Sequence, residues 1–385
     1  MAYAKQTILD LSQQLDQTTE NGVNLEDWLD RFLKERKILE DKYGTSFAFI
    51  INAQVQSLLY ARANQGKSRS AWYYNIGIEQ KLWSDAYIVF ELEGGHNKGI
   101  DKLLPTLSGL NSDAGEISYA YVNRFYLHQD FLDKKIFFNL GRLDLSDWFD
   151  SNEAANSGDI QFLSGALVGN LTVPFPQKGL GGVVGFSPVD WFYFQVGAAD
   201  ALASSTKAGF NRSFKGSFFI GEFGFLPKMG VNLQGNYRFM FYLDRQNLEY
   251  IDGLGKRRRD CGYALSFDQQ VTKRITFFCR YGFANQKVRD IRHFWSVGGQ
   301  LSQPILGRKD DFLGIGMAQS ILGRDYRQAY EYETASSETI YEIYYNFSLH
   351  PFMKFIPNIQ IVTSPYGKKS SGCNVVGGGR VVVLI

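Results

Sequence analysis

The sequence predicts an all-β protein: a transmembrane antiparallel β-barrel of about 16 strands, preceded by a short N-terminal helical segment. Composition is the first reason, because 15% of the 385 residues are aromatic, while glycine is frequent (39) and proline rare (9). Such a composition is typical of many strands joined by short turns. The second reason is an apolar period of two over segments of about ten residues, the length that crosses a bilayer. The polar opposite face of these segments is the third reason, since it suits a water-filled lumen better than a dry core.

Residues 1–45 have a different pattern from the rest of the chain. Apolar residues recur there at helical spacing, with charged residues between them. This pattern predicts one or two amphipathic helices that end at Gly44. Ala2-Tyr3-Ala4 has the form of a signal-peptidase site, so we expect residues 1–4 to be the stub of a trimmed signal peptide.

The period changes to two at Phe47. Apolar side chains then alternate with polar ones such as Asn52, Gln54 and Gln56. The same alternation recurs towards the C-terminus, and turn sequences such as Asp-Gly and Ser-Pro separate the segments. No low-complexity linker interrupts them. Residues 46–385 are therefore predicted to form one closed sheet.

Charge and composition argue against several other classes of protein. The 41 Lys and Arg residues nearly balance 39 Asp and Glu residues, so no overall charge points to a nucleic-acid partner. The 3 cysteines and 4 histidines are scattered without metal-ligand or disulfide spacing. No serine lies in a Gly-x-Ser-x-Gly motif. We therefore expect no enzyme activity, no cofactor and no metal. The sequence contains no apolar run of about 18 residues, so we expect no membrane-spanning helix.

Several segments follow one another in the order of a known family. They are GRLDLSDWFDSN at 141–152, the Phe-Pro and Gly-Leu-Gly sequences within 175–181, SPVDWFY at 187–193, ETIYEIYYNF at 338–347 and, upstream, Trp28, Leu39 and Gly44. Together, from about residue 28 to the end of the chain, they resemble the carbohydrate-selective porins of the OprB family.

The resemblance implies an outer-membrane barrel with a narrow pore for passive diffusion of monosaccharides and small oligosaccharides. It places the protein in the bacterial outer membrane. The expected partners are the permeating sugars, outer-membrane lipid and lipopolysaccharide, and the barrel assembly machinery, with monomer and homotrimer both open. The N-terminal helical segment would lie at the periplasmic mouth or plug it. A role in trimerisation or in facing peptidoglycan stays open as well.

A sugar pore needs aromatic faces that stack on pyranose rings and charged groups that hydrogen-bond to hydroxyls. Four residues with inward strand parity are expected to line the constriction: Glu91, Arg124, Arg142 and Asp144. Arg142 and Asp144 are placed two residues apart on one face of one strand. The alternative for each is a structural ion pair in the barrel wall.

Further residues are predicted to contribute to the lumen. Glu79, Arg62 and Arg238 would add general polarity, and Trp148 would serve as a stacking platform. The acidic residues between 144 and 153 are interpreted as a solvated loop rather than a calcium site, because their spacing does not fit an EF-hand.

Three other functions remain to be weighed against sugar diffusion. A general or anion-preferring porin is favoured by the inward arginines, and it is the main alternative. An outer-membrane lipase would need a lipid-facing Ser–His pair. An adhesion or structural protein would use the N-terminal helices as its interaction module.

Overall fold

The computed structural model describes residues 27–97, 99–113, 119–204, 216–230, 232–330 and 335–385. The expected signal stub and the first predicted helix lie outside these residues. None of the described helices is both long enough and apolar enough to span a membrane.

Strands make up most of the described chain. They are β1 (Thr45–Tyr60), β2 (Ser68–Trp83), β3 (Ala86–Asn97), β4 (Tyr121–Phe131), β5 (Ile136–Leu143), β6 (Gly179–Val189), β7 (Phe192–Asp200), β8 (Ser217–Phe225), β9 (Lys228–Met229), β10 (Leu233–Glu249), β11 (Arg257–Gln270), β12 (Ile275–Phe283), β13 (Ile291–Ser302), β14 (Phe312–Leu322), β15 (Ser337–His350), β16 (Met353–Thr363) and β17 (Cys373–Leu384). The described α-helices are α2 (Asp27–Tyr43), α3 (Gly165–Val168) and α4 (Arg324–Ala329). Short 3₁₀ helices are η1 (Ile100–Lys102), η2 (Leu145–Asp147), η4 (Pro365–Gly367) and η5 (Lys369–Ser371).

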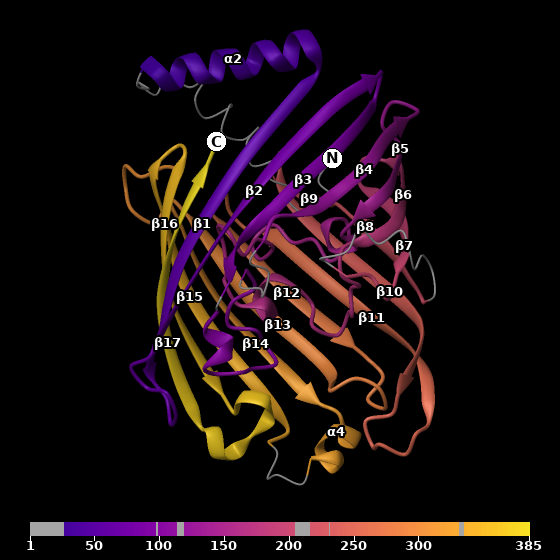
Figure 1. Ribbon diagram of the computed structural model, residues 1–385, viewed down its shortest axis with the longest axis vertical. Coiled ribbons are helices and arrows are strands. Elements are labelled where there is room, and N and C mark those ends of the chain that lie inside the picture. Colours follow the sequence, from indigo (N-terminus) through magenta and orange to yellow (C-terminus); the bar gives the residue numbers. More distant parts are fainter. Residues whose placement is uncertain (1–26, 98, 114–118, 205–215, 231, 331–334) are drawn as a thin grey trace.

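The strands form one closed antiparallel barrel (Figure 1). Each long strand pairs with its neighbours in sequence, and β1 closes the sheet by pairing with both β2 and β17. β9 has two residues and pairs only with the start of β10, so 16 long strands make the wall. The predicted fold class and strand number are therefore confirmed.

Alternation along β1 shows how the sequence sets the two faces of the wall. Asn52, Gln54 and Gln56 are buried inside the barrel, whereas Val55 and Leu59 are more than half exposed on the outside. Exposed Ile, Val, Leu and Phe side chains recur on the outer face of the other strands. An outer band of this kind is what lipid tails require of a barrel.

The described N-terminal helix lies across one end of the barrel (Figure 1). α2 ends at Tyr43, and Gly44 follows with φ of +66°, a left-handed conformation that glycine adopts without strain. The ring of Phe32 meets that of Phe47 on β1 edge to face at 5.7 Å. β1 begins at Thr45, next to the predicted start of the barrel.

The two ends of the barrel differ in the length of their connections. At the end that carries α2, turns such as Ser84-Asp85 have only two residues. The connections at the other end are longer, among them residues 144–178. Short periplasmic turns and long extracellular loops are the rule for outer-membrane barrels. The α2 end has the short turns that this rule gives to the periplasmic side.

Two of the long connections fold back into the barrel. We call residues 99–113 the short inward segment and residues 144–178 the long inward segment. Backbone hydrogen bonds join them, including Gly165 N to Gly109 O at 2.9 Å and Ser112 N to Leu163 O at 2.8 Å. They occupy space that the polar faces of the strands were predicted to share with water.

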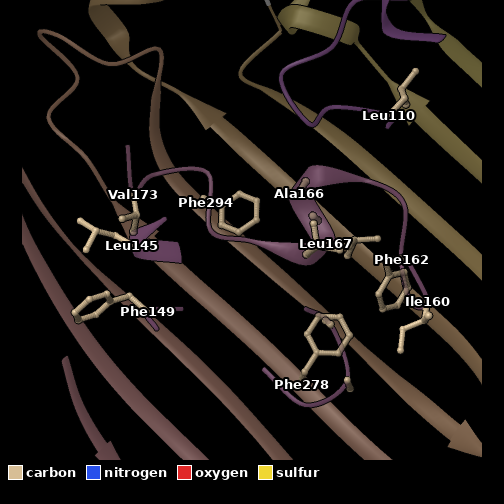
Figure 2. Packing of buried hydrophobic residues seen from close by; sticks show 14 of the residues in the cluster. Leu110, Leu145, Phe149, Ile160, Phe162, Ala166, Leu167, Val173, Phe278 and Phe294 are labelled. Carbon is tan, nitrogen blue, oxygen red and sulfur yellow. The ribbon is translucent and has the colours of Figure 1, made fainter. Parts of the chain in front are cut away.

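Apolar side chains attach the long inward segment to the wall (Figure 2). The ring of Phe162 lies 4.8 Å from that of Tyr344 on β15 and 5.7 Å from that of Phe278 on β12, both edge to face. Leu167, within α3, is also fully buried in this cluster. The barrel thus has a core of its own, within the lumen.

Candidate pore constriction

Arg124 on β4 lies where the wall meets the long inward segment. Its Nη1 donates to Oε2 of Glu91 on β3, the residue opposite it in the sheet. A β-bulge sets two residues of one strand against one of its partner, and here it brings Asn123 to the same carboxylate, with Nδ2 at 3.1 Å from Oε2. Asn75 on β2 adds another donor to that oxygen at 3.3 Å. Glu91 is therefore held by donors from two neighbouring strands.

The other side of the Arg124 guanidinium faces Asp147 of the long inward segment. Nε and Nη2 donate to the two carboxylate oxygens at 2.6 and 2.7 Å. A two-point pair of this kind fixes both distance and orientation. The Arg124 side chain is 13% exposed, against 0% for Glu91 and 5% for Asp147. Of the three groups, Arg124 is thus the most accessible to a solute in the lumen.

An aromatic pair lies next to this charge cluster. Tyr126 on β4 and Trp148, directly after η2, meet edge to face with ring centroids 5.5 Å apart. The backbone carbonyl of Trp148 accepts a hydrogen bond from Gln195 on β7 at 2.6 Å. The arrangement brings a guanidinium group and aromatic rings together at one place on the inner wall.

The long inward segment also contacts other sides of the barrel. Asp150 pairs with Arg280 on β12 at 3.0 Å. Asp159 accepts hydrogen bonds from Asn52 on β1, at 3.0 Å, and from the hydroxyl of Tyr73 on β2. The segment therefore crosses the lumen and narrows it. Among the described residues, no cluster of three or more His, Cys, Asp or Glu side chains could hold a metal ion.

Comparison with known proteins identifies this architecture. The family model of the carbohydrate-selective porin OprB family matches residues 86–383. The chain belongs to this family. No curated protein matches the chain in a sequence search.

Solved structures agree with the fold. Pseudomonas putida OprB at high pH aligns with a TM-score of 0.82 and 19% identity, covering 92% of this chain and 97% of that chain. The low-pH structure of that protein aligns with a TM-score of 0.60 and 17% identity, covering 92% of this chain and 96% of that chain. The outer membrane channel DcaP of Acinetobacter baumannii aligns with a TM-score of 0.54 and 10% identity, covering 89% of this chain and 97% of that chain. At these identities the likeness concerns the barrel alone, while the family match makes the chain an outer-membrane porin and assigns it to the channels rather than the enzymes.

In this OprB-family porin, the four residues expected at the constriction do not all meet. Glu91 and Arg124 are joined, as described above. Asp144 lies outside the strand, because β5 ends at Leu143, and its carboxylate caps η2 by accepting from Ser146 N at 3.0 Å. The expected position of Asp144 on one strand with Arg142 is therefore wrong.

Arg142 lies in the wall and does not join the Arg124 cluster. Its partners in the sheet, Phe125 and Leu180, belong to the outer face. Its Nε donates to the backbone carbonyl of Val122 at 2.8 Å, where β4 continues beyond its pairing with β5. The geometry favours a structural role in the wall for this arginine.

The remaining predicted residues are spread over the barrel. Glu79 is half-buried on the inner face of β2, between Glu91 and the end of the barrel that carries α2. Arg62 is exposed in the turn after β1 and donates to the Ser370 carbonyl, so it lies outside the strand that was expected to carry it. Arg238 is buried on β10 in a pair with Asp268 at 2.9 Å.

Asp147 was missed because the acidic run from 144 to 153 was interpreted as a solvated loop. That interpretation is wrong, since Asp147 and Asp150 are buried against arginines of the wall. The signal was present in the sequence: Leu145, Trp148 and Phe149 alternate with the acidic residues. Apolar and aromatic side chains at that density are unusual in a loop surrounded by water.

Proposed function

We propose that this porin passes monosaccharides and small oligosaccharides by passive diffusion, with Arg124 as the polar contact at its constriction. The observation that carries the proposal is the bidentate Arg124–Asp147 pair beside the Tyr126–Trp148 rings. The Tyr126 and Trp148 rings are only 8% and 6% exposed and offer a pyranose little apolar surface, whereas a guanidinium group offers donors to sugar hydroxyls. Contacts of this kind orient a neutral solute without retaining it, which transport requires.

The buried arginines favour sugar diffusion over anion selectivity. Arg238, Arg280 and Arg380 are each at most 2% exposed. The first two are paired with carboxylates, and Arg380 donates to the Gln161 carbonyl. The carboxylate partners compensate the charges of Arg238 and Arg280, so these two arginines contribute little to the attraction of anions in the lumen. Arg380 differs, because its Nε and Nη1 have no partner among the described residues. A strong anion preference in reversal potentials would favour the general-porin alternative instead.

Substitution of Arg124 tests the proposal. Arg124→Lys keeps the charge but loses the two-point geometry, and Arg124→Ala removes both. We expect block of the single-channel current by glucose to weaken about tenfold or more in Arg124→Ala, because hydrogen bonds to charged groups contribute about 1.5–3 kcal/mol. Arg124→Lys should fall between this variant and the parent.

The matched control is Arg257→Ala, which removes an arginine whose ion pair with Glu249 is more than 60% exposed. It should leave sugar block unchanged. Heat-modifiability in gels verifies that each barrel is folded. Equal sugar block in folded Arg124→Ala and parent protein would remove Arg124 from the constriction.

A further inference from the structure

Three rings line the inner wall between the Arg124 cluster and the periplasmic end. Tyr87 on β3, His128 on β4 and Phe137 on β5 are all half-buried. The ring centroids of Tyr87 and His128 are 6.0 Å apart, and those of His128 and Phe137 are 6.3 Å apart with planes at 20°. The three rings therefore form a continuous aromatic surface across three neighbouring strands.

The sheet register places this surface on the same face as the candidate constriction. His128 stands opposite Tyr87, just as Arg124 stands opposite Glu91. Each step of two residues along a strand returns to the same face, so Tyr126 lies midway between Arg124 and His128. The distance along the strand from Arg124 to His128 is about 13 Å at ~3.3 Å per residue. An oligosaccharide could contact both places at once, and a monosaccharide could not.

Buried polar atoms with unused hydrogen-bonding capacity lie beside the rings. Asn139 Oδ1 is 2.9 Å from His128 Nδ1, while Asn139 Nδ2, fully buried, has no partner among the described residues. Asp130 Oδ2 is 3.3 Å from His128 Nε2, and its buried Oδ1 likewise has no partner there. Unpaired buried polar atoms are unfavourable, so they favour a hydroxyl-bearing ligand or water at this place.

A glycine on the neighbouring strand leaves the space in which one of these rings lies flat against the barrel wall. Gly185 on β6 stands opposite Phe137, and a side chain there would overlap the Phe137 ring. Because glycine leaves this space free, the ring lies against the strand. Its half-buried state then leaves apolar surface to the lumen, where a soluble core would have covered it.

We propose that Tyr87, His128 and Phe137 form a second carbohydrate-binding site on the periplasmic side of the constriction. The ligand is an oligosaccharide of pyranose units, whose C–H faces stack on the rings. The inference rests on the proposed sugar pathway and adds a site to it. A sugar that leaves the constriction would meet this surface before it reaches the periplasm.

The test compares glucose with maltotriose as blockers of single channels in a planar bilayer. The variant is Tyr87→Leu/Phe137→Leu, which keeps apolar volume and removes both flat rings. We expect the residence time of maltotriose to fall about three- to tenfold, as expected for the loss of aromatic contacts. Glucose block should be unchanged, because glucose binds at the constriction alone.

Phe131→Leu is the matched control, since Phe131 ends β4 next to this site but is 51% exposed on the outer face. Arg124→Lys serves as the second comparison, and it should weaken block by both sugars. The proposed site is overturned if the folded double variant holds maltotriose as long as the parent does. It is also overturned if the variant weakens glucose and maltotriose equally. If neither sugar blocks the parent channel, the sugar pathway and this site are both wrong.

Discussion

Asp311 shows how a single residue can fix a turn at the end of the barrel that carries α2. It lies in the turn between β13 and β14 and is almost completely buried. Arg308 donates to both of its carboxylate oxygens, the Tyr345 hydroxyl donates at 2.9 Å and Ser348 N donates at 3.0 Å. Burial opposes ionisation of Asp311, but these hydrogen bonds outweigh it and lower the pKa of the carboxyl group.

A lowered pKa makes the contribution of Asp311 to stability depend on pH. The contribution is fully present above the unfolded pKa of about 3.9 and is lost as the pH falls through the lower folded value. We expect Asp311→Asn to lower the thermal unfolding midpoint by a few degrees at pH 7. The difference from the parent should begin to shrink as the pH falls below about 4, and it should disappear only once the pH is below the lowered pKa of the folded protein.

Thermal unfolding in detergent between pH 3 and pH 8 measures this difference. Asp310→Asn is the control, because Asp310 is an exposed carboxylate in the same turn. A difference for Asp311→Asn that stays constant down to pH 3 would contradict the assignment.

Strand parity predicted the position of some charged residues and not of others. The extra residue of the bulge lies on β4 and not on β3, so the inward direction of Glu91 follows from the period of two. Arg124 reaches Glu91 beside a β-bulge, and the position of a bulge cannot be predicted from the strand pattern of the sequence. For Arg142, strand parity predicted a place beside Arg124, whereas its partners in the sheet are Phe125 and Leu180. Asp147, the partner of Arg124, lies in the connection between β5 and β6, so no local pattern in β4 could pair the two residues.

The two inward segments are the elements that fill part of the barrel lumen. Buried carboxylates of β15 hold them by pairs of backbone N–H groups. Glu342 accepts from Leu163 N at 2.7 Å and from Ser164 N at 2.9 Å. Glu338 accepts from Leu107 N at 2.9 Å and from Ser108 N at 2.7 Å. Each segment is thus anchored to the same strand of the wall.

Removal of one anchor should loosen the long inward segment. In Glu342→Ala, two buried N–H groups lose their acceptor, at a cost of about 1–3 kcal/mol each. We expect a folded barrel with a higher and noisier single-channel conductance and weaker sugar block. Planar-bilayer recording measures all three.

The control for this variant is Glu249→Ala, whose carboxylate is 67% exposed in its pair with Arg257. It should conduct as the parent does. If Glu342→Ala shows parent-like conductance and sugar block, the long inward segment does not depend on this anchor.

Elements formed by local pattern were predictable, and those held by distant contacts were not. The strands and α2 follow from apolar periods within each segment. The inward path of residues 144–178 depends on partners such as Glu342, which is separated by 179 positions from Leu163. A sequence without an alignment carries no information on such pairs. The apolar residues of the segment indicated burial, but not against which strand.

At the scale of the whole molecule, the barrel wall and the two inward segments inside it have different roles. The outer face of exposed Ile, Val, Leu and Phe side chains suits the membrane, while the two inward segments fill part of a wide 16-stranded lumen. Composition, strand length and alternation were enough to predict the barrel. They were not enough to predict how much of the lumen is filled, because a polar inner face is compatible with water and with hydrogen-bonded protein.

The most direct measurement is the single-channel conductance of the parent protein in a planar bilayer, with glucose and then malto-oligosaccharides titrated from one side. A sugar-selective porin should give steady conductance that falls saturably as the sugar concentration rises. Steady conductance that is indifferent to every sugar, with a clear ion preference in a salt gradient, would contradict the proposed function and favour a general porin of the same architecture.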